Sequence, residues 1–107
     1  MVGYIVVLCT VPDQASGRKI AGDLLARRLA ACVNISGTVE SHYWWEDKIQ
    51  QDEEFVLIIK TREDLFPPLE EAILRMHPYD VPEVIALPIK RGSPAYLQWI
   101  AAETKRR

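Results

Sequence analysis

Three side chains of types that bind transition metals stand out in this sequence. They are Cys9, His77 and Glu83, which offer a thiol, an imidazole and a carboxylate. Sulfur, nitrogen and oxygen donors in this mixture suit a transition metal such as copper or zinc. The three residues are far apart along the chain, so they can form a site only if the fold brings Cys9 close to the segment 77–83.

The apolar and β-branched segments predict four strands. Tyr4 to Thr10 is an almost continuous apolar run, as expected for a central strand that is buried on both faces. Residues 31–61 contain two segments rich in β-branched and aromatic residues on either side of Glu46-Asp47-Lys48, which predicts a long hairpin. The fourth strand is Val84 to Ile89, where Pro88 favours an edge or a bulge over a central position.

Capping residues and hydrophobic spacing predict three helices, at about residues 13–31, 63–77 and 95–105. Asp13 or Ser16 can cap the first helix, which we expect to end near Ala31. Pro78 stops the second helix after His77. Ser93-Pro94 places a capping side chain and a proline at the start of the third.

The order strand–helix–strand–strand–helix–strand plus a helix predicts an α+β fold of the ferredoxin-like βαββαβ type. Two helices cover a four-stranded antiparallel sheet, and the C-terminal helix is extra. The first strand then lies antiparallel to the fourth, so Cys9 comes near the segment that carries His77 and Glu83. Cys32 opens the second strand, at the opposite end of the sheet, which excludes a Cys9–Cys32 disulfide.

Each candidate ligand has a structural alternative. Cys9 alternates with Ile5 and Val7, as a small buried apolar side chain would. His77 can cap the C-terminus of the second helix, and Glu83 can be a charge at a strand edge. A Cys9–His77 nucleophile pair would need an oxyanion hole and a third group, which the sequence does not identify. The common catalytic motifs are absent, so we expect no enzymatic activity.

The predicted hairpin carries aromatic side chains on both faces. Tyr43 and Trp45 share one face of the first arm, and Trp44 lies on the other. Together with Trp99 of the last helix, these rings predict an interface with another copy of the chain. The alternative is that the tryptophans line a ligand pocket.

The length of 107 residues predicts one domain, spanning 1–107. A net charge of -2 argues against a nucleic-acid partner, which would need a basic surface. Membrane insertion is not expected, because no apolar run approaches about 20 residues. The N-terminal segment lacks the basic region and cleavage site of a signal peptide, so we expect a cytoplasmic protein.

Several motifs, in this order along the chain, resemble the CutA family of divalent-cation tolerance proteins. They are Val7 to Asp13, Leu29 to Asn34, Tyr43 to Glu46, Lys60-Thr61, His77 to Glu83 and Tyr96 to Trp99. The resemblance covers the chain from Tyr4 to Trp99. Its most specific parts are the His-Pro-Tyr-x-Val-Pro-Glu run and the hairpin that carries the tryptophans.

The resemblance implies a tight homotrimer in which the long hairpins meet neighbouring subunits. It also implies binding of divalent copper, with family ligands that correspond to Cys9 and His77. Two positions depart from the family pattern. Met76 stands where some relatives carry a second histidine, and Asp47 stands where glycine is common in the hairpin turn. Aspartate tolerates a left-handed conformation, so we expect the turn to be kept.

Trimeric PII signal-transduction proteins share this architecture, which provides an alternative function. A PII-like trimer would bind a small ligand or a partner in clefts between its subunits. An RNA-recognition domain has the same element order, but Phe55 to Ile59 offers aliphatic side chains where such a domain needs exposed aromatic ones. We therefore predict a metal-tolerance homotrimer that binds copper or zinc, with no obligatory cofactor.

Overall fold

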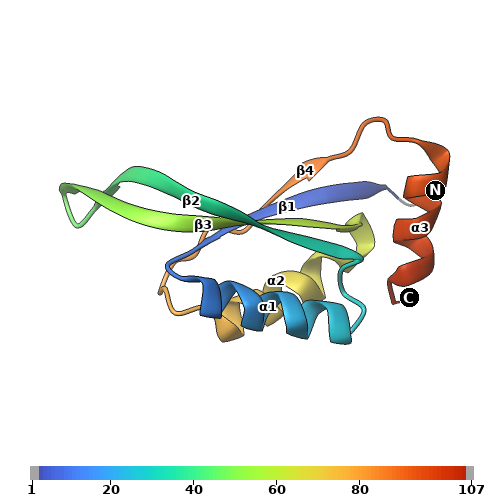
Figure 1. The fold of residues 1–107 in the computed structure, drawn as a ribbon, viewed down its shortest axis with the longest axis horizontal. Coiled ribbons are helices and arrows are strands. Elements are labelled where there is room, and N and C mark those ends of the chain that lie inside the picture. The colour runs from blue at the N-terminus through green and yellow to red at the C-terminus, as the bar shows by residue number, and fades with distance from the viewer. Residues whose placement is uncertain (1–2, 106–107) are drawn as a thin grey trace.

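The sheet has the strand order predicted from the sequence. The computed structural model describes residues 3–105 (Figure 1). Its strands are β1 (Tyr4–Val11), β2 (Cys32–Trp45), β3 (Lys48–Arg62) and β4 (Ile85–Pro88). They lie in the order β2-β3-β1-β4, and every neighbouring pair is antiparallel. This is the mixed α+β arrangement expected of a ferredoxin-like sandwich.

Two of the three helices cover the same face of this sheet (Figure 1). These are α1 (Gln14–Ala26) and α2 (Phe66–Met76), and a short 3-10 turn, Glu63–Leu65, precedes α2. The third helix, α3 (Pro94–Glu103), lies at the end of the sheet away from the hairpin tip. We call the face opposite α1 and α2 the open face.

The hydrophobic core lies between the sheet and the two covering helices. Every second side chain of β1 points into it, namely Ile5, Val7, Cys9 and Val11. The sequence predicted that this strand would be buried on both faces. Its other side chains, on the open face, are only partly buried within one chain. The open face continues on β4, where Ile85 and Leu87 are 49% and 48% exposed.

The first helix ends at Ala26, five residues earlier than predicted. Its end has the hydrogen bonds of a Schellman motif, from the Arg28 amide to the Leu25 carbonyl and from the Leu29 amide to the Leu24 carbonyl. Arg28 adopts φ 59°, a left-handed conformation that glycine usually provides. Because no glycine marks this position, the sequence pattern did not reveal the stop.

The hairpin turn consists of Glu46 and Asp47, with φ of 51° and 61°. Two successive left-handed residues are typical of a type I′ turn, which fits the twist of a two-stranded ribbon. The prediction that Asp47 can replace glycine here is confirmed. Nearer the sheet, β2 has one extra residue between the pairs Ile35–Leu57 and Thr38–Phe55. This β-bulge bends the ribbon where it leaves the sheet.

The remaining boundaries differ slightly from the predictions. The fourth strand covers four residues, Ile85–Pro88, rather than Val84 to Ile89, and it lies at the edge of the sheet as Pro88 suggested. His77 caps the C-terminus of α2, as expected. Among the described residues, no helix is long and apolar enough to cross a membrane.

Candidate functional site

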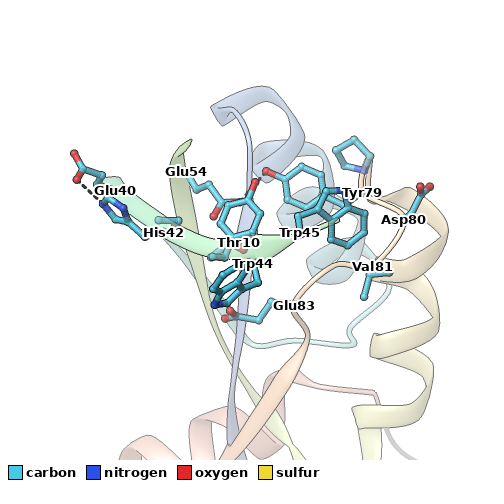
Figure 2. Close-up of a pocket in the computed structure, with 13 residues that line it drawn as sticks. Thr10, Glu40, His42, Trp44, Trp45, Glu54, Tyr79, Asp80, Val81 and Glu83 are labelled. Atoms are coloured by element: carbon cyan, nitrogen blue, oxygen red, sulfur yellow. Dashed lines mark hydrogen bonds and ion pairs between the residues drawn. The ribbon is translucent and has the colours of Figure 1, made fainter. Parts of the chain in front are cut away.

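A cavity of about 820 Å³ lies where the hairpin leaves the sheet (Figure 2). Its wall comes from the outer part of the hairpin, the end of β1 and the loop 78–83, which connects α2 to β4. The wall includes one imidazole, His42, and four carboxylates, those of Glu40, Glu54, Asp80 and Glu83, but no lysine or arginine. The cavity therefore attracts cations and repels anions.

In this wall, buried Glu54 is hydrogen-bonded to Tyr79, which is partly buried. Glu54 is 6% exposed, and the Tyr79 hydroxyl donates a 2.7 Å hydrogen bond to its Oε2 atom. Burial of the phenol and this hydrogen bond to Glu54 raise the pKa of Tyr79 above its ordinary value. Tyr79 thus stays protonated and keeps donating to the carboxylate.

His77 uses both of its ring nitrogens to hold the backbone. Its Nε2 atom lies 2.8 Å from the carbonyl oxygen of Thr10, and its Nδ1 atom lies 3.0 Å from the amide nitrogen of Tyr79. A carbonyl can only accept and an amide can only donate, so the proton is on Nε2. A metal could bind His77 only after one of these hydrogen bonds breaks.

Cys9 is fully buried on the side of the sheet that faces the helices. Burial raises the pKa of the Cys9 thiol to about 12, and the negative charges of Glu83 and Glu54 act in the same direction. Metals bind the thiolate rather than the thiol, so this environment disfavours Cys9 as a ligand.

The structure does not bring Cys9, His77 and Glu83 together as a ligand set. The end of β1 does lie near the start of β4, as predicted, but adjacent strand residues point to opposite faces. Glu83 lines the cavity beside Thr10, whereas Cys9 points to the helices. Within residues 3–105, no group of three or more His, Cys, Asp or Glu side chains could hold a metal ion.

The four aromatic residues proposed as interface residues are all exposed in the single chain. Trp44 is 71% exposed, and Tyr43, Trp45 and Trp99 are about 40% exposed. Tyr43, Trp44 and Trp45 line the cavity, as the pocket alternative required, whereas Trp99 packs on Tyr96 of α3. Their role in an interface stays a prediction.

Sequence reasoning missed two pairs of residues at this site. His42 Nε2 and Glu40 Oε1 are 2.7 Å apart at one end of the cavity, on one face of the ribbon (Figure 2). Glu54 and Tyr79 come from segments 25 residues apart. The spacing of His42 and Glu40 on a strand could have revealed the first pair. The second could not be found, because Glu54 follows two other acidic residues and resembles a solvated stretch.

Residues 5–103 match the family model described as CutA1 divalent ion tolerance protein. The chain belongs to the CutA1 family. A crystal structure of CutA1 from Oryza sativa is 52% identical and has a TM-score of 0.95, covering 99% of this chain and 97% of that chain. The family resemblance and the fold predicted from the sequence are both confirmed.

Two curated CutA1 relatives differ in the share of their length that matches. The chloroplastic protein CutA 1 of Oryza sativa subsp. japonica is 54% identical over 94% of this chain and 57% of its own length. The divalent-cation tolerance protein CutA of Thermus thermophilus is 46% identical over 92% of this chain and 96% of its own length. Since the rice relative is chloroplastic, a cytoplasmic location for this chain stays a prediction.

Proposed function

We propose that this chain contributes to divalent-cation tolerance by binding transition metal ions such as copper, as a homotrimer and without an obligatory cofactor. Membership of the CutA1 family supports the tolerance role. The observation that carries the proposal is the wall of the cavity, which offers four carboxylates and one imidazole but no lysine or arginine. We expect no enzymatic activity.

The His42–Glu40 pair is the best-placed pair of metal donors in this cavity. The two side chains are 54% and 63% exposed, so an ion can reach both of them. Imidazole nitrogen and carboxylate oxygen are both common ligands of copper and zinc. Water or donors of a neighbouring copy would fill the other coordination positions, which suits a modest and reversible site.

The ligand set Cys9, His77 and Glu83 is a second proposal for the metal site. Binding there would require the buried Cys9 thiol to lose its proton and His77 to give up a backbone hydrogen bond. We therefore expect the His42–Glu40 pair to bind copper or zinc more tightly than this set.

The open face and the hairpin rings support assembly into a homotrimer. Val6, Leu8, Val56 and Ile58 lie on the open face, next to the exposed Ile85 and Leu87 of β4. An apolar sheet face of this kind is normally covered, and α1 and α2 both lie on the opposite side. Burying it against copies of the chain, with hairpins reaching the neighbours, would remove apolar surface from water.

Calorimetric titration of the metal-free protein with copper and zinc tests this proposal. We expect a saturable site that His42→Ala removes and that Cys9→Ala leaves largely unchanged. Gln51→Ala is the matched control, because Gln51 lies opposite His42 in the hairpin but does not line the cavity. Loss of binding in Cys9→Ala and His77→Ala, but not in His42→Ala, would favour the other ligand set.

A PII-like trimer that binds a small ligand is the second candidate function. The observation that favours it is the size of the cavity, about 820 Å³, which is far larger than a single ion needs. Small-molecule pockets typically measure about 300–1,000 Å³. If neither copper nor zinc binds in a saturable way, the small-ligand function becomes the better explanation of the cavity.

A further inference from the structure

Glu54 is a buried carboxylate whose charge lacks a positive partner among residues 3–105. It is 6% exposed, and the hydrogen bond that it accepts comes from the neutral hydroxyl of Tyr79. Acidic side chains are rarely buried unless their charge is paired, because removing it from water is costly. Glu54 lines the cavity. A positive charge in the cavity would therefore compensate it.

Four aromatic side chains line the same cavity as Glu54. Glu54 lies opposite Val39 in the hairpin, so Tyr43 and Trp45, which alternate with Val39, project from the same face of the ribbon. Tyr79 reaches Glu54 from the loop 78–83. The faces of tryptophan and tyrosine rings attract cations, most strongly where water is partly excluded.

Two features separate this part of the cavity from a simple metal site. Metal ions need several close donors, and the hydrogen-bond partner of Glu54 is a phenol, whereas Glu40 pairs with the imidazole of His42. Asp80 points away from the other side chains that line the cavity (Figure 2). Aromatic walls around one buried carboxylate suit a larger cation, whose charge is spread over alkyl groups.

We propose that this cavity binds a small organic ammonium ion, with its charged group between the Glu54 carboxylate and the rings of Trp45 and Tyr79. The inference rests on the cavity of the proposed function. It requires no metal, and its residues differ from the His42–Glu40 pair. The ammonium ion would displace water from the rings and compensate the buried carboxylate, while the Tyr79 hydroxyl keeps Glu54 oriented.

Calorimetric titration of the assembled protein with tetramethylammonium chloride tests the inference, and uncharged tert-butanol is the control ligand of similar size. We expect saturable binding of tetramethylammonium and none of tert-butanol. Glu54→Gln keeps the shape of the side chain but removes its charge, so it should weaken binding about tenfold or more. Glu53→Gln is the matched control, because Glu53 is exposed and does not line the cavity.

A ring variant supplies a second readout. Trp45→Leu, tested at a protein concentration at which light scattering shows it assembled, should also weaken tetramethylammonium binding, whereas Leu25→Ala, on helix α1, should not. Equal binding of tert-butanol, no saturable binding, or unchanged affinity in Glu54→Gln would overturn the inference. Loss of assembly in Glu54→Gln would also overturn it, because a basic group of a neighbouring copy would then compensate Glu54.

A zinc titration of the same variants separates this inference from the proposed function. If His42→Ala loses zinc but keeps tetramethylammonium, the two sites are independent, as we expect. If the wild-type protein binds tetramethylammonium but neither copper nor zinc, the metal proposal fails and the ammonium inference stands. If the wild-type protein binds copper or zinc but not tetramethylammonium, the ammonium inference fails and the metal proposal stands.

Discussion

His77 donates a hydrogen bond of 2.8 Å from its Nε2 atom to the carbonyl oxygen of Thr10. This contact joins the end of α2 to the end of the central strand β1. The other ring nitrogen of His77 accepts the amide of Tyr79, so the same side chain also fixes the loop that carries Tyr79 and Glu83. A residue that looked like a metal ligand thus shapes the wall of the cavity.

His77→Ala should therefore destabilise the metal-free protein. The change leaves the partly buried amide of Tyr79 without its acceptor and removes the donor to Thr10, which together should lower the free energy of unfolding by about 2 kcal/mol. Urea unfolding followed by circular dichroism measures this loss. His77→Gln is the control, because its amide can still donate to Thr10. An unchanged unfolding midpoint in His77→Ala would contradict the structural role.

The buried Cys9 thiol should make the protein less stable at high pH. In the unfolded chain the thiol ionises near pH 9.0, whereas its folded pKa is raised to about 12. Between these values the unfolded state has lost a proton that the folded state keeps, so the free energy of unfolding falls as the pH rises. Urea unfolding at pH 8 to 10 measures the slope, to which Tyr79, whose pKa is also raised, adds as the pH approaches 10.

Cys9→Ala is the comparison for this pH dependence. Removing the buried sulfur should cost about 1 kcal/mol at pH 8, but the variant should lose less stability between pH 8 and 10. Cys32 is only partly buried, so a thiol reagent should modify Cys32 and spare Cys9 in the folded protein. Equal slopes in the two proteins, or rapid modification of Cys9, would show that the thiol is more accessible than the structure indicates.

Asp47→Gly should stabilise the hairpin. Asp47 adopts φ 61° in the turn, where glycine avoids the steric cost that a side chain carries, so we expect a gain of about 0.5 kcal/mol in the free energy of unfolding. Thermal unfolding measures the gain. Lys48→Gly, one residue further in β3, should instead destabilise the protein. A lower melting temperature for Asp47→Gly would mean that the Asp47 side chain makes a favourable contact.

Trp44→Ala and Trp45→Ala should weaken the proposed trimer, because each removes a large exposed ring from the hairpin. Light scattering at low protein concentration measures the mass of the assembly. Leu25→Ala is the control, since Leu25 is about as exposed as Trp45 but lies on α1, on the covered side of the sheet. A trimer mass that is unaffected by both tryptophan changes would argue that the open face alone holds the copies together.

Most of the fold could be predicted because periodicity and turn chemistry act locally. The alternation in β1, the Asp13 cap and the Glu46-Asp47 turn each depend on neighbouring residues, and the order of the elements with right-handed crossovers then predicts the sheet order. The end of α1 was misjudged because Arg28 takes the left-handed position that a glycine usually marks. Local patterns thus predict elements well, except where a residue adopts a conformation that is unusual for its type.

The site was harder to predict because it depends on which side of the sheet each residue occupies. Topology correctly placed Cys9 near the start of β4, but Cys9 and Thr10 point to opposite faces, and only Thr10 joins the cavity. The partnership of Glu54 with Tyr79 depends on the path of the loop 78–83. Neither the path nor the resulting burial follows from the spacing of residues along the chain.

The extra residue between Ile35 and Thr38 shifts the alternation of side chains along β2 by one position. Before it, odd-numbered side chains of β2 face the helices, and beyond it, even-numbered ones do. Deleting one residue at Ser36 or Gly37 would remove the bulge but keep Thr38 opposite Phe55, so Trp45 would stay on the side of Glu54. Deleting both residues would instead shift the pairing with β3 by one position, so Trp44 would replace Trp45 on the side of Glu54 and the cavity would change without a substitution in its wall.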